Sequence, residues 1–365
     1  MAKIMLIGTN MMNLYNHRLE LIEELIESGY SVYVVAPRSG EEKELEKIGV
    51  IFIHSDIDNR GTSISKDFKC LLTFLKIFRS VKPDVILTFY TKTNIYGGLA
   101  ARITRIPYIE NITGLGSAVS KGGLLGKLMT WLYSAAVKDA RMVFFQNTNN
   151  QQFFHDHNIK IKAEKLLPGS GVSLNRHPVL PYPDSNEMNF VFLSRILKEK
   201  GIFEYVDAAR RIEKKYPNVV FHVVGPCDYS LKDYLEKCKK ERIVHVQGKI
   251  FDVNDFISKS HCVILPSYYA EGMANVLLES AACGRPLITT DMPGCKETVD
   301  DNVSGYIVKP RDVDDLVDKI EKFINLPHSS KIEMGLAGRR KMEKEFDRKI
   351  VVDAYIDQIE KILKE

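Results

Sequence analysis

The sequence predicts an α/β fold with two doubly wound, parallel-sheet domains. The chain has 365 residues, a length typical of two domains of ordinary size. Short apolar runs alternate with segments of helical periodicity along most of the chain. The apolar runs are continuous, as expected for parallel strands that helices cover on both faces.

Twelve apolar segments are expected to form strands. They are residues 3–8, 31–37, 50–55, 84–90, 106–113 and 142–147 in the first half, and 189–196, 219–226, 243–249, 262–267, 285–291 and 305–310 in the second. Segments between them, such as 19–29 and 204–217, carry apolar residues at helical spacing. Residues 171–189 contain three prolines and little periodicity, which predicts a linker between the two domains.

Composition favours a soluble globular protein of the cytoplasm. Hydrophobic residues make up 45% of the chain and charged residues 27%. No apolar run approaches the roughly 20 residues that span a bilayer, and the first residues read as a strand rather than a signal peptide. Six cysteines are scattered without a CxxC pair, which argues against a zinc site or a disulfide framework.

Positive charge is concentrated in one region. Between Arg60 and Arg141 there are thirteen Lys or Arg residues against four Asp or Glu residues. Such a region can meet nucleic acid, an anionic membrane or a phosphorylated substrate, or it can be an ordinary solvated surface. Within it, residues 66–82 have the pattern of a basic amphipathic helix. This helix could lie on an anionic bilayer or pack on its own sheet.

Several short motifs do not carry a function. No GxGxxG follows the first strand, which weakens a nicotinamide-binding interpretation. The DID at residues 56–58 could hold a divalent metal through paired carboxylates, but a solvated loop is the favoured interpretation, because isolated DxD occurs often by chance. The DVDD at 312–315 is interpreted as a helix N-terminus, where acidic side chains suit the helix dipole. The histidines show no metal-ligand spacing, so no metal site is expected.

The segment EGMANVLLES, residues 271–280, follows an apolar run that ends at residue 267. We expect a helix to begin near Ala274, with amide groups at its start that attract anions. Glu271 and Glu279 are eight residues apart, about two helical turns, and should share a face. Each carboxylate suits a pair of vicinal hydroxyls. Together these features favour a nucleotide sugar, although an ordinary helix with two surface glutamates would show the same pattern.

A second segment supports the first. VFLSRILKEKGI, residues 191–202, leaves a predicted strand and offers Arg195 and Lys200 before a helix. Two cations at a strand end can neutralise a diphosphate, the arginine as a bidentate fork and the lysine as a point charge. Surface charge alone is the other interpretation of this segment.

These segments carry a resemblance to a known family. EGMANVLLES resembles the E-x7-E motif of the retaining family 4 glycosyltransferases, and SRILKEKG resembles their Arg/Lys diphosphate motif. Residues 16–37 and 84–117 resemble the capsular-polysaccharide branch of that family. The resemblance implies a GT-B fold, in which two Rossmann-like domains face each other across a cleft. The implied parts are an acceptor domain at 1–170, a linker at 171–189, a donor domain at 190–346, and a helix at 347–365 that returns to the first domain.

The resemblance also implies roles for individual residues. Glu271 would contact the donor sugar, Glu279 the ribose, and Arg195 and Lys200 the diphosphate, with Glu271, Arg195 and Lys200 as the catalytic set. Further donor contacts would come from Gly248, Phe251, Gly272, Met273, Ala274, Asn275 and Val276. Candidate acceptor or cleft residues are Asn13, Asn16, Arg18, Lys92, Asn94 and Thr113. The family often has a histidine where Thr113 stands, which puts the donor sugar's identity in doubt.

The implied reaction moves a hexose or N-acetylhexosamine from a UDP-sugar, with retention and without a metal or other cofactor. The acceptor would be a lipid-linked saccharide in capsule, exopolysaccharide or O-antigen synthesis, at the inner face of the cell membrane. An epimerase of the same fold would use the same donor site without an acceptor. A sugar-binding protein without chemistry would normally be secreted, and a nucleic-acid binder would leave E-x7-E unexplained. We therefore expect no nucleic-acid partner.

Overall fold

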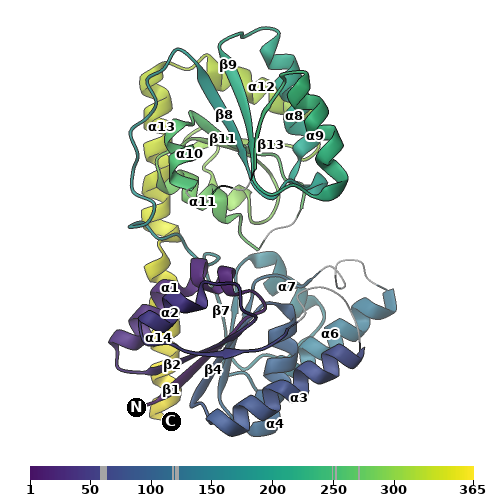
Figure 1. Ribbon diagram of the computed structural model, residues 1–365, viewed down its shortest axis with the longest axis vertical. Helices are drawn as coiled ribbons and strands as arrows, with labels where there is room; N and C mark the ends of the chain where they lie inside the picture. The colour runs from purple at the N-terminus through teal and green to yellow at the C-terminus, as the bar shows by residue number, and fades with distance from the viewer. Residues whose placement is uncertain (58–63, 117–118, 120–122, 249, 251–252, 270–271) are drawn as a thin grey trace. The chain divides into compact units, whose positions relative to one another are not determined.

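The computed structural model describes residues 1–57, 64–116, 119, 123–248, 250, 253–269 and 272–365. The chain divides into two compact units. Unit 1 consists of Met1–Ser170 together with Arg348–Glu365, and unit 2 is Gly171–Asp347. Each unit contains one parallel sheet covered by helices (Figure 1).

The sheet of unit 1 has seven strands in the order β3-β2-β1-β4-β5-β6-β7, and every pairing is parallel. The strand order reverses beside β1, so the loops after β1 and β4 diverge to opposite faces. In parallel sheets, ligands bind at this switch point, outside the carboxyl ends of the strands. The strands are β1 (Lys3–Ile7), β2 (Ser31–Ala36), β3 (Ile51–His54), β4 (Val85–Phe89), β5 (Tyr108–Ile112), β6 (Met142–Phe145) and β7 (Glu164–Leu166).

Helices cover both faces of this sheet (Figure 1). α1 and α14 share one core cluster, while α3, α4 and α6 share the cluster on the other face. The helices are α1 (Met11–Glu27), α2 (Glu42–Lys47), α3 (Ile64–Val81), α4 (Gly98–Thr104), α6 (Gly123–Val137), α7 (Thr148–Asp156) and α14 (Arg348–Lys364), and a π-helical turn spans Thr93–Gly97. α1 forms because Asn10 caps its start and its apolar residues recur at helical spacing.

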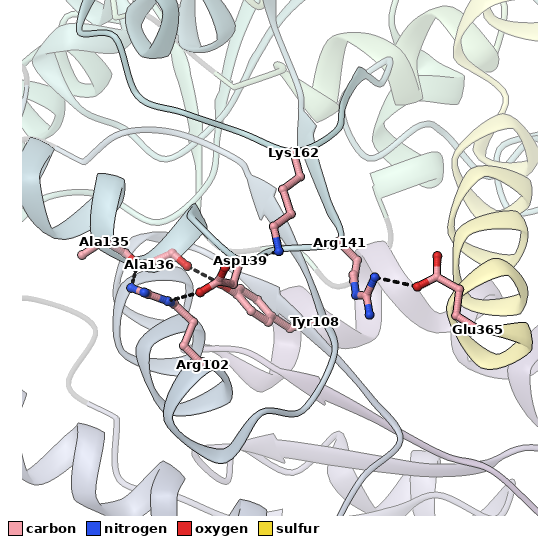
Figure 2. Close-up of polar contacts among 8 residues, drawn as sticks. All are labelled: Arg102, Tyr108, Ala135, Ala136, Asp139, Arg141, Lys162 and Glu365. Carbon is pink, nitrogen blue, oxygen red and sulfur yellow. Dashed lines mark hydrogen bonds and ion pairs between the residues drawn. The ribbon is translucent and has the colours of Figure 1, made fainter.

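The last helix is tied to unit 1 by charged contacts. Arg348 donates to the Glu20 carboxylate at 2.7 Å and to the Asn16 carbonyl at 3.0 Å. At the other end of α14, Glu365 pairs with Arg141 at 2.6 Å (Figure 2). Tyr355 lies on α14 between these two contacts. Its side chain is buried in the core cluster that includes residues of α1 and β4.

The sheet of unit 2 has six strands in the order β10-β9-β8-β11-β12-β13, again all parallel. Its switch point lies between β8 and β11. The strands are β8 (Met188–Leu193), β9 (Val219–Val224), β10 (His245–Gln247), β11 (Cys262–Leu265), β12 (Leu287–Thr290) and β13 (Gly305–Val308). The helices are α8 (Ile202–Glu213), α9 (Lys232–Lys240), α10 (Val253–Lys259), α11 (Asn275–Ala282), α12 (Val313–Ile324) and α13 (His328–Lys341).

Residues 171–187 form no helix and no named strand, yet they are held firmly to unit 2. The fully buried guanidinium of Arg285 donates to the carbonyls of Leu180 (3.0 Å) and Pro181 (2.6 Å). It also donates to carbonyls of α10, including that of Ile257 at 2.9 Å. A buried guanidinium needs its donors filled, so the extended segment is part of the packing of unit 2.

The parallel α/β architecture predicted from the sequence is confirmed, and each of the twelve predicted strands is present. β7 was not predicted. The interpretation of 312–315 as a helix start is also confirmed, because the Asp312 side chain accepts from the Asp315 amide at the N-terminus of α12. In the part of the chain that the structure describes, no helix is both long and apolar enough to cross a membrane.

Candidate functional site

The segment with Arg195 and the segment with Glu279 follow the two strands at the switch point of unit 2. Arg195 comes directly after β8, and the second segment comes after β11. The two loops touch: the Tyr268 amide donates to the Glu199 carbonyl at 3.0 Å. A Cβ added at Gly201 would lie 2.0 Å from the Pro266 carbonyl oxygen, so the start of α8 lies against the end of β11. The structure therefore brings these two predicted segments together at one edge of the sheet.

Arg195 and Lys200 lie differently within their loop. Arg195 is exposed, between Ser194 and Ile196, whose amides donate to the carbonyls of Val224 and Pro226. Lys200 ends a 3₁₀ turn and is only 8% exposed. The backbone on both sides of Arg195 is therefore fixed by hydrogen bonds, while its side chain faces solvent. Lys200, in contrast, is packed within its turn.

A third loop completes this edge. Gly225, after β9, has φ 136°, and a Cβ there would lie 1.9 Å from the Ser194 carbonyl oxygen. The Gly225 amide also donates to the Gly248 carbonyl at 3.3 Å. Gly248, predicted to lie near the base, is exposed at the end of β10. Gly225 was not singled out from the sequence, although a glycine between an apolar run and a proline marks such a turn.

α11 presents one side to solvent. It begins at Asn275 after Ala274, and among the described residues no side chain caps its first turn. Asn275, Val276 and Glu279 are partly exposed, whereas the other side of the helix is buried. Because i and i+4 share a face, Asn275 and Glu279 lie one above the other. The anion-binding geometry expected of this helix start is thus compatible with the structure.

The structure confirms where this helix begins. Gly272, Met273 and Ala274 are not helical, α11 starts at Asn275, next to the expected Ala274, and Glu279 lies in its second turn. The Ala274 amide donates to the Gly294 carbonyl at 2.8 Å, which holds these residues in their non-helical path. Glu271 and Phe251 themselves lie outside the described residues.

Tyr268 and Arg311 add an aromatic and a cation to the same edge. The Arg311 guanidinium lies 4.2 Å from the centre of the Tyr268 ring, a cation–π contact. Desolvation raises the pKa of Tyr268 above its ordinary value, and the positive charge of Arg311 opposes this rise. Arg311 has φ 62°, a conformation that is uncommon for a residue with a side chain. The sequence analysis did not single out either residue.

In unit 1, three predicted acceptor residues lie on α1, which follows β1. Asn13 and Asn16 are exposed, whereas Arg18 is only 4% exposed. The Arg18 guanidinium lies over the rings of Phe89 and Tyr355, at 4.7 Å and 6.0 Å from their centres. α1 thus carries two exposed amides and a largely buried cation near the carboxyl edge of the sheet.

The remaining acceptor candidates occupy different environments. Lys92 pairs with Asp67 at 3.1 Å. Asn94 is fully buried and donates to the Asn111 carbonyl at 2.8 Å. Thr113 is partly exposed just after β5. In this structure Asn94 is therefore a packing residue below the surface, while Lys92 and Thr113 remain reachable.

The acidic DID segment shows no metal-binding arrangement in its described part. Asp56 is exposed and lies 3.0 Å from the Nε2 atom of His54, while Asp58 lies outside the described residues. Across the described ranges, no three His, Cys, Asp or Glu side chains are placed to share a metal ion.

Comparison with known proteins identifies both halves of the chain. Residues 3–147 match the family model "Glycosyl transferase 4-like", and residues 182–341 match "Glycosyl transferases group 1". A Campylobacter jejuni N,N'-diacetylbacillosaminyl-diphospho-undecaprenol alpha-1,3-N-acetylgalactosaminyltransferase is 24% identical, over 96% of each chain. The Staphylococcus aureus capsular polysaccharide biosynthesis glycosyltransferase CapM is 26% identical, over 94% of this chain and 93% of its own.

Solved structures agree on the fold. A glycosyltransferase from Rickettsia africae superposes with a TM-score of 0.81 at 16% identity, covering 100% of this chain and 99% of its own. The Anabaena protein HepE, solved in complex with UDP-glucose, gives a TM-score of 0.76 at 18% identity and covers 100% of both chains. Together with the two family models, these likenesses show that the chain is a family 4 glycosyltransferase with the GT-B fold.

Proposed function

We propose that this enzyme transfers a hexose or N-acetylhexosamine from a UDP-sugar, with retention of anomeric configuration, to a lipid-linked saccharide. The observation that carries the proposal is the switch point of unit 2. There an exposed Arg195, the Lys200 turn and the open side of α11 lie at one sheet edge. A diphosphate flanked by two hydroxyl-bearing groups matches this combination of cations and carboxylate.

In this proposal, the donor diphosphate lies between Arg195 and the start of α11. Arg195 and Lys200 neutralise the charge that grows on the diphosphate as the bond to the sugar breaks. Glu279 accepts hydrogen bonds from the ribose hydroxyls, and Glu271 contacts the sugar. Gly248 and Phe251 flank the base, and residues 272–276 offer amide groups to the sugar and phosphates.

The chemical step is a substitution at the anomeric carbon on the face that the leaving group departs from. The acceptor oxygen forms the new glycosidic bond while the bond from that carbon to the diphosphate oxygen breaks. The acceptor's proton passes to the departing diphosphate, which leaves as UDP. The protein contributes positioning and charge stabilisation, and the scheme needs no metal ion.

The acceptor is proposed to lie against unit 1 at the carboxyl edge of its sheet. Asn13, Asn16 and Thr113 offer exposed polar groups there, and Arg18 and Lys92 offer cations. The Campylobacter jejuni relative and an Escherichia coli galactosyltransferase (24% identical over 82% of each chain) both carry diphosphoundecaprenol acceptors in their names. By analogy, we place this enzyme in capsule, exopolysaccharide or O-antigen synthesis.

Such an acceptor would place the enzyme at the cytoplasmic face of a membrane. Residues 66–82, predicted as a basic helix, correspond to α3, and its Lys69, Lys76 and Arg79 side chains are exposed. We propose weak contact of this helix with anionic lipid, and no role for nucleic acid.

Calorimetric titration of the purified chain with UDP, UDP-sugars and other nucleotides tests the donor assignment. UDP and one or more UDP-sugars should bind, and Glu279→Ala should weaken both. Glu213→Ala, at the exposed end of α8, serves as a matched control on the same unit. Equal affinity of the parent and Glu279→Ala for UDP would contradict the placement of the donor on α11.

A further inference from the structure

The outer side of α6 is apolar. Leu124 is 88% exposed, Leu128 47% and Trp131 65%. Their spacing of four and three residues places them on one side of the helix. Gly126, Tyr133 and Val137 are buried on the inner side. A surface helix normally has polar residues on the side that faces water. The apolar outer side of α6 is instead typical of a surface that contacts a partner.

This exposure belongs to a helix whose end is fixed (Figure 2). The Arg102 guanidinium donates to the Ala135 carbonyl, and the Tyr108 hydroxyl donates to the Ala136 carbonyl. Just beyond α6, Asp139 pairs with Arg102 at 2.8 Å and with Lys162 at 3.3 Å. The last turn of α6 is thus held by β5 and α4, while its first turns carry the exposed leucines.

α3 also carries exposed apolar residues. Phe68 is 60% exposed and Leu72 is 49% exposed, one turn apart. α3 and α6 pack on the same face of the sheet and both contact the π-helical turn Thr93–Gly97. Figure 1 shows both helices on that side of unit 1.

Basic side chains lie on the same two helices as these apolar residues. They are Lys69, Lys76, Arg79 and Lys127, all exposed, and within the described ranges none of them pairs with a carboxylate. The wider region from Arg60 to Arg141 has thirteen basic residues against four acidic ones. An apolar side ringed by cations complements a surface that offers hydrocarbon beneath negative charge.

The position of this surface relates it to the acceptor edge. A helix that follows a strand of a parallel sheet runs back along it, so its first turns lie at the carboxyl edge of the sheet. The exposed apolar residues occupy the first three turns of α3 and α6. They lie at the edge where Asn13 and Lys92 follow β1 and β4.

We propose that the first turns of α3 and α6 form a docking face that inserts into the surface of an anionic bilayer. The docking face consists of Phe68, Leu72, Leu124, Leu128 and Trp131, with Lys69 and Lys127 at its rim, while Lys76 and Arg79 lie further along α3. The apolar residues enter the acyl region, the tryptophan lies at the headgroup level, and the cations bind lipid phosphates. A second copy of the chain fits less well, because two basic rims would repel each other.

A pocket beside Trp131 suits the same partner. It has a volume of about 490 Å³ and lies between α6 and α7, lined by Gly126, Trp131, Phe153 and Ile159 among others. The lining also includes the polar side chains of Lys127, Thr130, Ser134 and His157, so the pocket offers both apolar and polar surface to a lipid at the margin of the docking face. Docking itself is independent of the proposed reaction, whereas its benefit to catalysis rests on the proposed lipid-linked acceptor.

Trp131 is the only tryptophan of the chain and therefore reports on this face directly. The full chain would be titrated with vesicles of phosphatidylglycerol and phosphatidylethanolamine, and its fluorescence and co-sedimentation measured. We expect a blue shift of the emission, quenching by lipids brominated on their acyl chains, and much weaker binding to phosphatidylcholine vesicles or at high salt. Absence of both the shift and co-sedimentation would overturn the proposal.

Paired variants separate the docking face from the rest of the surface. Leu124→Ser with Leu128→Ser should lower the vesicle partition coefficient roughly tenfold or more. Lys69→Ser with Lys76→Ser should lower it by about fivefold per lysine. The matched controls are Ile103→Ser with Val303→Ser, and Lys239→Ser with Lys240→Ser, which change exposed positions outside the docking face.

All of these variants should keep the parent's affinity for UDP, so failure of docking and failure of the proposed donor site give different results. Vesicle binding that none of the face variants weakens would place the lipid contact elsewhere and overturn the proposal. A Trp131 blue shift that depends on protein concentration without vesicles would mean that a second copy covers the face, which would also overturn it.

Discussion

The Arg18 guanidinium lies 4.7 Å from the centre of the Phe89 ring, at the carboxyl edge of the unit 1 sheet. Its one described hydrogen bond goes to the neighbouring His17 carbonyl at 3.1 Å, and no carboxylate among the described residues pairs with it. A guanidinium has five N–H donors, so Arg18 retains donors for a ligand. The adjacent Tyr90 has φ 76°, a strained conformation of the kind found at functional sites.

Arg18→Gln is therefore expected to raise the KM for the lipid-linked acceptor by roughly ten- to a hundredfold, the value of one or two hydrogen bonds to a charged group. UDP affinity should not change, because the donor residues belong to unit 2. Arg38→Gln is the matched control, since Arg38 also lies over a ring, that of Phe52 at 5.7 Å, but on an exposed site. An unchanged acceptor KM in Arg18→Gln would remove Arg18 from the acceptor site.

Arg195→Ala should lower kcat/KM by about 10²–10³, the usual effect of losing one preorganised electrostatic partner. Charge on the diphosphate grows as the glycosidic bond breaks, so the loss should appear mainly in kcat. Because the side chain is exposed, the fold should survive, as circular dichroism and thermal unfolding would show. Arg195→Lys should recover part of the rate, since it keeps the charge but not the bidentate fork.

Glu279→Ala should behave differently from Arg195→Ala. Ribose contacts change little during the reaction, so the variant should raise the donor KM and weaken UDP binding while kcat falls little. Steady-state kinetics of both variants with the same donor provide the comparison. Normal turnover by Arg195→Ala would show that the diphosphate lies elsewhere.

Activity should persist in EDTA, because cations at the switch point are proposed to neutralise the diphosphate. Initial rates would be measured after dialysis against EDTA, with and without added manganese or magnesium. Loss of activity that only a divalent metal restores would contradict the proposal and direct attention to residues 56–58.

Glu110 makes the stability of unit 1 depend on pH. It is fully buried on β5, neither carboxylate oxygen has a hydrogen-bond partner among the described residues, and a Cβ built on Gly98 would lie 2.2 Å from Oε1. Burial raises the pKa of Glu110 well above its usual 4.5. Above pH 4.5 the unfolded chain releases this proton and the folded chain keeps it, so the free energy of unfolding falls as pH rises.

The expected slope is about 1.4 kcal/mol per pH unit for one proton, up to the pKa of the folded state. Denaturant unfolding of the parent and of Glu110→Gln between pH 5.5 and 7.5 would measure it. Glu110→Gln should flatten the slope, and equal slopes in the two proteins would contradict this assignment of the buried proton.

The sequence predicted the parallel strands well because a strand buried on both faces must be a continuous apolar run. β7 escaped prediction because its three residues, Glu164, Lys165 and Leu166, lie at the sheet edge and are largely exposed. Short edge strands need no apolar run. Their pairing depends on the neighbouring strand, β6, and not on their own composition.

The candidate site was predictable in part for a similar reason. Loops after strands could be recognised, which placed Arg195 and Glu279 at a sheet edge. The burial of Arg18 and Asn94 could not be recognised, because it depends on contacts with Phe89, Tyr355 and Asn111 that are distant in sequence. Likewise, apolar residues at helical spacing normally predict a core-facing side, so the exposure of Leu124 and Trp131 required the structure.

The most direct test of the central claim is product analysis with a UDP-sugar panel, in the presence and absence of an undecaprenyl-diphosphate-linked saccharide. The account predicts UDP release coupled to a new glycosidic bond on the acceptor, and nuclear magnetic resonance of the product should show the anomeric configuration of the donor. Inversion at the anomeric carbon would contradict the proposed mechanism. A free epimer formed from the donor alone, with no sugar on the lipid, would contradict the transfer itself and identify an epimerase.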